Sequence, residues 1–211
     1  MSRSTGQRAR ATTKRRPGGR TAAVSTRIHD AALALLAEQG YAAFALADLA
    51  ARAEVNRTTL YRRWPTKAAL ILDAIALRIE ERIVIPDTGS LRDDLTAMLA
   101  GLSAFLRSPV GRAALAAALE IGPSAGVAGQ WQRLWRRRLG AIEPDFARAR
   151  ARGEMAADQD TEALLAAAAG AIYFRLFIAS RPANAAWIGR VVALLLHRTR
   201  GKTKPAPLTS R

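Results

Sequence analysis

Residues 57–67 contain seven polar or cationic side chains that could bind a charged partner. They are Arg57, Thr58, Thr59, Tyr61, Arg62, Arg63 and Lys67. Guanidinium and ammonium groups bind phosphate oxygens, and a guanidinium can also pair with the edge of guanine. Hydroxyl groups add neutral phosphate contacts. This combination favours recognition of nucleic acid rather than bond breaking.

The spacing around these residues predicts two short helices joined by a tight turn. In the first, residues 46–53, apolar side chains recur every three or four positions and form one stripe. Asn56 has a side-chain oxygen that can cap the second helix, residues 57–64. Leu60 and Trp64 are four residues apart and can face a core, which leaves the polar side chains outward. This is the layout of a helix-turn-helix DNA reader.

Longer helices must hold this pair in place. An apolar stripe predicts a helix over residues 25–39, with Gly40 as its C-terminal stop. A helix over residues 67–85, apolar on more than one side, links the reader to the rest of the chain. No alternation typical of strands is sustained, so the expected fold class is all-α. Further helices are expected over residues 91–107, 109–121, from about 130 with a kink or break at Pro144, from 158–161, and 183–197.

Composition bounds the other possibilities. The chain has 211 residues, no cysteine and a net charge of +16. Residues 1–24 carry seven basic side chains and no acidic one, and residues 197–211 carry five and none. Both tails are therefore expected to be disordered, the first as a basic arm that follows DNA. The two imidazoles, His29 and His197, are isolated, so no metal site or cofactor is expected.

Enzymes and membrane proteins are disfavoured. The chain contains no phosphate-binding GxxxxGK[ST] loop and no HExxH motif, and GPSAGVAG is not a dinucleotide fingerprint. The longest apolar run, Ala163 to Phe174, is shorter than the ~20 residues of a membrane span and is closed by Arg175. We therefore expect a cytoplasmic protein that is not an enzyme.

The segment from Pro17 to about Ile75 resembles the DNA-binding domain of the TetR (tetracycline repressor) family of bacterial transcription regulators. Its most specific parts are the pair Gly40-Tyr41, the block TTLYRRWPTK and the apolar helix after it. The resemblance implies four parts: a basic arm (1–24), a helix-turn-helix domain (25–70), a ligand-sensing and dimerisation domain (71–197), and a tail (198–211).

By this resemblance the protein is a regulator, repressor by default, that binds a palindromic operator in double-stranded DNA as a homodimer. Arg57 and Thr58 match base-reading positions, whereas Tyr61, Arg63 and Lys67 match phosphate-contacting positions. Thr59 lies on the same edge, and Arg62 suits either role. Two positions depart from the family: the turn has Glu54 in place of glycine, and Ala45 stands where a threonine usually caps the first reading helix.

The resemblance also implies a small-molecule effector of unknown identity and a dimer interface. Residues expected to line an effector pocket are Met98, Leu102, Phe105, Trp131, Trp135, Tyr173 and Phe177. The last two helices have broad apolar sides, and their expected dimer contacts are Leu165, Ile172, Leu176, Ile188, Val191, Val192 and Leu195.

Two alternatives stay open at this point. A non-specific basic DNA binder without an effector would depend on its charged tails, and its affinity would fall steeply with salt. A helical interaction protein that no longer binds DNA would fit the departures at Glu54 and Ala45.

Overall fold

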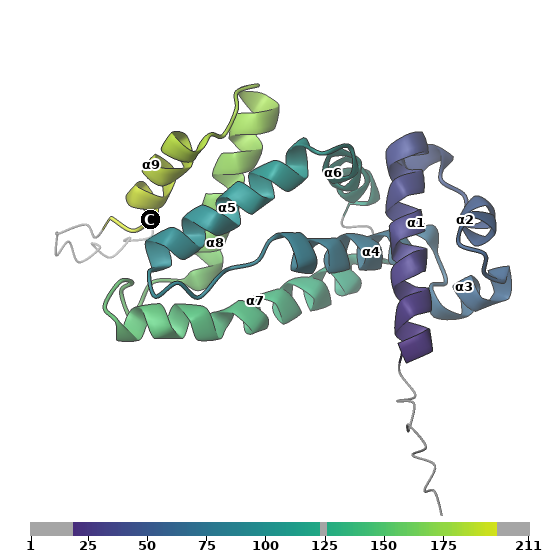
Figure 1. Cartoon of the computed structure of the whole chain (residues 1–211), viewed down its shortest axis with the longest axis horizontal. Coiled ribbons are helices and arrows are strands. Elements are labelled where there is room, and N and C mark those ends of the chain that lie inside the picture. Colours follow the sequence, from purple (N-terminus) through teal and green to yellow (C-terminus); the bar gives the residue numbers. More distant parts are fainter. Residues whose placement is uncertain (1–18, 123–125, 198–211) are drawn as a thin grey trace, which may run out of the picture.

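The computed structural model describes residues 19–122 and 126–197, and within them the chain is entirely helical, without a strand. This confirms the predicted all-α class. The helices that carry the DNA-reading segment lie at one end of an elongated molecule, and the last two helices lie at the other (Figure 1). The elements are α1 (Gly19–Ala43), α2 (Leu46–Arg52), α3 (Arg57–Arg63), α4 (Lys67–Arg82), α5 (Leu91–Arg107), α6 (Pro109–Ile121), α7 (Ala128–Ala151), α8 (Thr161–Tyr173), the π-helical turn η1 (Phe174–Ile178) and α9 (Ala185–Leu195).

Two boundaries differ from the sequence-based expectations. Helix α1 begins at Gly19, so the end of the predicted arm is helical, whereas residues 1–18 and the tail 198–211 lie outside the described residues. A kink or break was expected at Pro144, and helix α7 continues through this residue, so the break is wrong. Ile142 and Phe146 on either side of the proline are buried. Their packing offsets the lost backbone hydrogen bond.

Side-chain caps explain where most helices begin. Asn56 accepts a hydrogen bond from the Thr58 backbone N–H at 2.8 Å, and Thr66 accepts one from that of Ala69 at 3.1 Å. Ser90, Ser108, Asp160 and Asn184 act in the same way at α5, α6, α8 and α9. Helix α2 has no such cap, because Ala45 has no side-chain acceptor.

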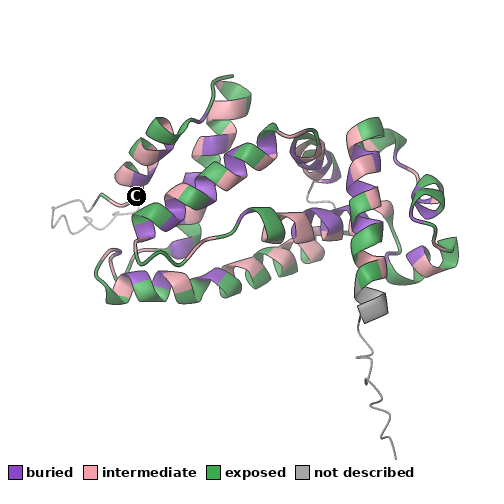
Figure 2. Cartoon of the chain, viewed as in Figure 1, coloured by how far each residue is buried: buried purple, intermediate pink, exposed green. Residues whose placement is uncertain are grey.

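The buried residues form two clusters (Figure 2). The first joins α1–α4 to α6, with Ala114, Ala117 and Ile121 of α6 buried beside the reading helices. The second joins the end of α4 to α5, α7, α8 and α9. The division between the clusters therefore does not follow the predicted domain boundary at residue 70, because α6 belongs with the reader.

Helices α5 and α6 meet at a close corner. Ser108 caps α6 with its hydroxyl, which accepts from the Gly111 N–H at 3.0 Å and donates to the Phe105 carbonyl at 2.7 Å. A Cβ atom at Gly111 would lie 1.9 Å from the Phe105 carbonyl oxygen. Only glycine fits there.

By length and composition alone, the segment Thr161–Ile178 is apolar enough to cross a membrane, as core helices of soluble proteins can also be, and 22% of it is buried within the protomer. Sequence inspection missed this because the run was ended at Arg175. In the structure the π-helical turn η1 carries Arg175 and continues the apolar surface to Ile178.

Candidate nucleic-acid interface

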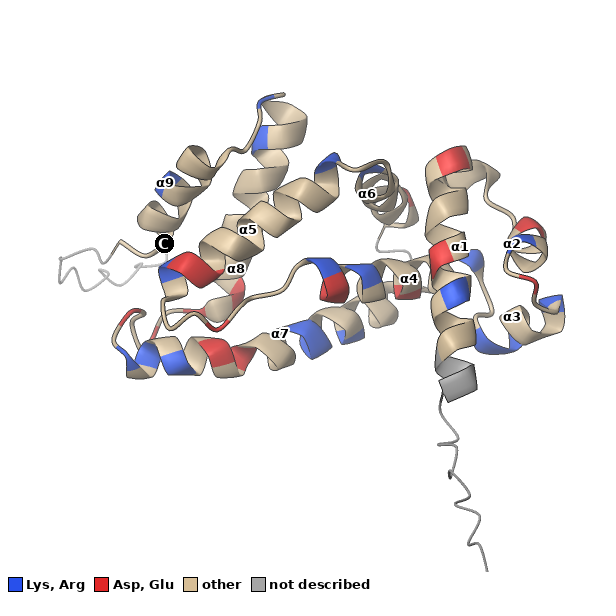
Figure 3. Ribbon diagram, viewed as in Figure 1, with Lys and Arg blue, Asp and Glu red and all other residues tan. Residues whose placement is uncertain are grey.

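Helix α3 separates an apolar anchor from a polar outer face. Leu60 is fully buried and Trp64, directly after the helix, is 4% exposed. The side chains of Arg57, Thr58, Tyr61, Arg62 and Arg63 are exposed, and Figure 3 shows the positive charges of α3 at the end of the molecule. The structure thus brings these five predicted residues onto one accessible helix. Thr59 is only half-exposed.

The turn between α2 and α3 is tight, as predicted, and Glu54, which stands where the family usually has glycine, adopts a left-handed φ of 52°. The Val55 N–H donates to the Ala50 carbonyl at 3.0 Å across this turn. On the outer side, Arg52 of α2 forms a two-pronged ion pair with Glu38 of α1, with N–O distances of 2.5 and 2.6 Å. Helix α2 is therefore fixed to α1 even without an N-cap.

Lys67, predicted to contact a phosphate, is already held by contacts within the protein. Its ammonium donates to the Tyr41 carbonyl at 2.9 Å and lies 4.3 Å from the centre of the Tyr41 ring. The ammonium also donates to the Ala42 carbonyl at 3.4 Å, so three contacts to the end of α1 hold this cation, which is half-buried. Lys67 joins α4 to the Gly40-Tyr41 corner, and only part of its donor capacity remains for a phosphate.

A partly buried polar cluster of His29, Trp64 and Asp73 holds the C-terminal end of α3. The Trp64 indole N–H donates to the Asp73 carboxylate at 3.0 Å, and Nε2 of His29 lies 3.1 Å from the same oxygen. The His29 and Trp64 rings meet edge to face at 5.4 Å. Arg63 stacks on the other part of the Trp64 ring, 4.6 Å from its centre. One carboxylate of α4 thus connects α1 to the end of the recognition helix.

The hydrogen bond from His29 lowers the pKa of Asp73 most, and the Trp64 N–H and the charge of Arg63 lower it further, against the effect of burial. Asp73 is therefore a carboxylate in the folded protein at neutral pH. Sequence analysis did not single it out. A lone acid inside the apolar run ALILDAI was the available signal, because a charge among buried residues needs partners.

The geometry of this surface suits binding to DNA. In the described part of the chain no group of three or more His, Asp or Glu side chains is placed to hold a metal ion. The exposed side chains of α3 are those that contact phosphates and base edges. The fold and this surface define the class of helix-turn-helix DNA-binding regulators.

The chain belongs to the TetR family of bacterial transcription regulators. Residues 28–74 match the family model for bacterial regulatory proteins of the tetR family, and residues 85–195 match that for the tetracyclin repressor-like C-terminal domain. It is a transcriptional regulator with a helix-turn-helix DNA-binding domain.

Similar proteins agree with this assignment. The HTH-type transcriptional regulator AqdR of Rhodococcus erythropolis is 33% identical over 70% of this chain and 71% of its own length. The DNA-binding transcriptional repressor TetR of Mycobacteroides abscessus is 33% identical over 76% of this chain and 85% of its own. The crystal structure of the TetR family regulator SCO0332 superposes with a TM-score of 0.68 and 31% identity, covering 82% of this chain and 96% of that one.

A cavity of about 360 Å³ lies in the second half of the chain, between α4, α5, α7 and α8. Four of the predicted pocket residues line it: Met98, Leu102, Trp135 and Tyr173. Three do not. Phe105 lines a different cavity, Trp131 lines a smaller one between α4 and α7, and Phe177 is exposed on η1. Helical spacing could not resolve which side of α7 and η1 faces inward.

Some of the predicted dimer residues are buried inside the protomer, and the others are half-buried. Ile172, Ile188 and Val192 are buried inside the protomer, so the structure removes them from any surface. They pack in the second cluster because α8 and α9 cover α5 with their inner faces. Leu165, Leu176, Val191 and Leu195 are half-buried, and Leu165 also lines the cavity of about 360 Å³. The large exposed apolar side chains at this end are Phe174, Phe177, Ile178 and Leu194.

Proposed function

We propose that this protein is a sequence-specific regulator, a repressor by mode of action, that binds a palindromic operator as a homodimer in the cytoplasm. Residues 25–70 read DNA and residues 71–197 sense a ligand and dimerise. The observation that carries the proposal is the polar outer face of α3, anchored by Leu60 and Trp64.

In this proposal α3 enters the major groove. Arg57 pairs with guanine and the Thr58 methyl group meets thymine. Tyr61, Arg63 and Lys67 hold phosphates and set the register. Thr59 and Arg62 lie beside them. Lys67 contributes less than the two others, because its ammonium already contacts Tyr41.

The dimer forms through the outer faces of α8, η1 and α9. Phe174 is 61% exposed, Ile178 72% and Leu194 76%. An apolar surface of this size is unfavourable in water and is typical of an interface. A two-fold dimer would present two α3 helices to successive major grooves, about 34 Å apart.

The effector binds in the cavity of about 360 Å³, which is mostly apolar. Arg138 stands at its wall, where burial lowers the pKa of the guanidinium, and its N–H donates to the Ile83 carbonyl at 2.6 Å. Burial also raises the pKa of Tyr173, so its hydroxyl stays protonated and can donate. An apolar, partly aromatic compound with one hydrogen-bond acceptor fits this lining. Its binding would favour the form with the wrong spacing of the two α3 helices and release DNA.

The test is selection of a duplex from a random pool with the full chain, followed by fluorescence anisotropy at about 150 mM salt, near physiological ionic strength. Preference over a scrambled duplex should be about 10³-fold or more. Arg57→Ala should reduce that preference by about 30-fold or more, because each of the two protomers loses a base contact that contributes about 1–3 kcal/mol. Arg92→Ala is the matched control, because Arg92 is exposed on α5.

A non-specific basic DNA binder is the second candidate, and the net charge of +16 favours it. Deletion of residues 1–18 discriminates between the two. It should weaken binding by a regulator while leaving its preference for the selected duplex intact. If the full chain bound both duplexes with equal affinity, and the deletion nearly abolished binding to both, the protein would be a non-specific binder.

A further inference from the structure

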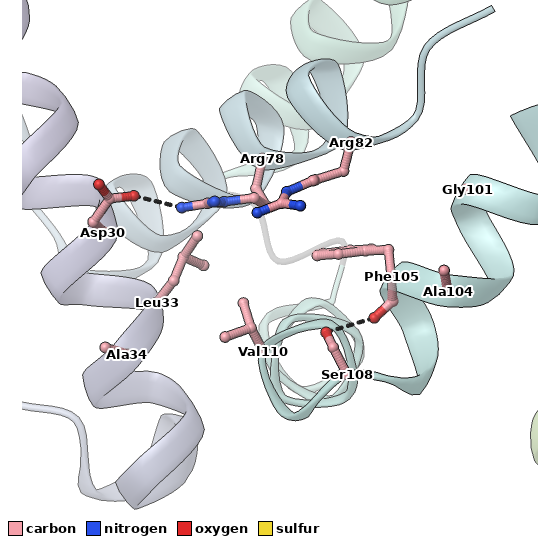
Figure 4. A pocket seen from close by; sticks show the side chains of 10 residues that line it. All are labelled: Asp30, Leu33, Ala34, Arg78, Arg82, Gly101, Ala104, Phe105, Ser108 and Val110. Carbon is pink, nitrogen blue, oxygen red and sulfur yellow. Dashed lines mark hydrogen bonds and ion pairs between the residues drawn. The ribbon is translucent and has the colours of Figure 1, made fainter.

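A second cavity, of about 450 Å³, lies where α1 meets α4, α5 and α6. Its walls come from α1, α4, α5 and the start of α6 (Figure 4). It shares no lining residue with the proposed effector cavity within the described chain. The residues that decide its chemistry are Asp30, Leu33, Arg78, Arg82, Phe105 and Val110.

Two arginines line this cavity, and Arg82 is the one whose charge no described carboxylate pairs with. Arg78 and Arg82 are one turn apart on α4, and both side chains extend over the cavity in Figure 4. Asp30 of α1 is the one acidic side chain among the lining residues, and it pairs with Arg78, which also lies 3.7 Å from the carboxylate of Glu81. The Arg78 Nε is buried without an acceptor among the described residues. Arg82 has no hydrogen bond or ion pair with any described residue, so its donors are free.

The other walls of this cavity are apolar or have polar groups that are already hydrogen-bonded. Leu33, Phe105 and Val110 project into the space from three different helices (Figure 4). The Ser108 hydroxyl is occupied by its bonds to the Phe105 carbonyl and the Gly111 N–H. A molecule held here would therefore meet cationic donors on one side and apolar side chains on the other.

We propose that this junction is a second ligand site, which takes a small amphipathic carboxylate with an aromatic or short aliphatic body. The carboxylate pairs with the guanidinium of Arg82, because a guanidinium matches a carboxylate in shape and charge. The body packs between Leu33, Phe105 and Val110. Such a ligand touches α1 of the reader and α5 and α6 beside it, and so favours the arrangement in which these helices are together.

The experiment is calorimetric titration of the full chain, without DNA, with 1-naphthoate and with its neutral analogue 1-naphthamide. We expect naphthoate to bind and naphthamide to bind at least about ten-fold more weakly, because the amide lacks the charge. Arg82→Met should weaken naphthoate by a similar factor and leave naphthamide unchanged.

Two exposed alanines provide a matched pair that identifies the cavity. Ala104 lines this junction and Ala166 lines the proposed effector cavity. Ala104→Trp should abolish binding of naphthoate, and Ala166→Trp should leave it unchanged. Three results would overturn the proposal. Naphthoate binding could be abolished by Ala166→Trp and not by Ala104→Trp, or it could be unaffected by both Ala104→Trp and Arg82→Met. Naphthoate could also fail to bind the wild-type chain up to about 1 mM. None of these readouts depends on operator binding, so failure here is separate from failure of the proposed function.

Discussion

Replacing Asp73 should weaken the connection between the recognition helix and α1 and α4. In Asp73→Ala the Trp64 indole N–H and Nε2 of His29 lose the oxygen that they share, at 3.0 and 3.1 Å. A hydrogen bond contributes about 1 kcal/mol net, and a buried donor left without a partner costs about 1–3 kcal/mol. The Asp73 side chain is 38% exposed, so water can replace part of the loss. We expect the free energy of unfolding to fall by about 2 kcal/mol.

The matched variants are Asp73→Asn and Asp158→Ala. Asparagine keeps one oxygen for the Trp64 N–H but loses the charge, so its loss should be about half as large. Asp158 is exposed. Its removal should change stability by less than about 0.5 kcal/mol. Urea unfolding at one fixed protomer concentration measures all three, because the stability of the proposed dimer would depend on concentration.

The effect of Asp73 should also depend on pH. Its partners lower its pKa in the folded protein below the ordinary value of 3.8, so the unfolded chain takes up the proton first as pH falls. The stabilisation is complete above about pH 4 and is lost as pH falls through the lowered pKa. The difference between wild type and Asp73→Ala should therefore shrink in acid. An Asp73→Ala protein as stable as Asp158→Ala at pH 7 would refute the reasoning.

Three other changes have calculable outcomes. Asn56→Ala removes the cap at the Thr58 N–H and should cost about 1 kcal/mol of stability and weaken operator binding, which urea unfolding and anisotropy measure together. Glu54→Gly relieves the left-handed φ of 52° and should raise stability by about 0.5–1 kcal/mol, because the strain relieved exceeds the entropy that glycine adds; a lower Tm would contradict this. Gly111→Ala places a methyl group 1.9 Å from the Phe105 carbonyl oxygen. It should lower the free energy of unfolding by about 3 kcal/mol, which a large fall in Tm would show. The control is Gly140→Ala, which should not lower Tm, because the space around the Cβ position of Gly140 is open.

Local signals allowed much of the reader to be predicted. Asn56 caps α3, Glu54 takes the left-handed turn, and Leu60 and Trp64 face the core, because each depends on neighbours within a few residues. Interactions between distant residues could not be read in this way. His29 and Asp73 are 44 residues apart in sequence, and nothing local announces their contact.

The body of the chain was harder for a related reason. Its helices are rich in alanine and leucine on several sides, so periodicity did not distinguish core from surface. Ile172, Ile188 and Val192 proved to be core rather than interface, and Phe105 and Trp131 line other cavities than the one expected. Only the packing of α8 and α9 on α5 determined which apolar side faces inward.

The packing of α6 against the reader limits how this protein can exchange parts with its relatives. Helix α1 makes its most extensive contact with α6, and Ala114, Ala117 and Ile121 share a core with the reading helices. A chimera joined at the end of α4 would cut through that core and leave an apolar side of α1 in water. Changing the residues on the outer face of α3 is therefore the least disruptive way to alter DNA specificity. A chimera that transfers the DNA-binding helices must also include α6.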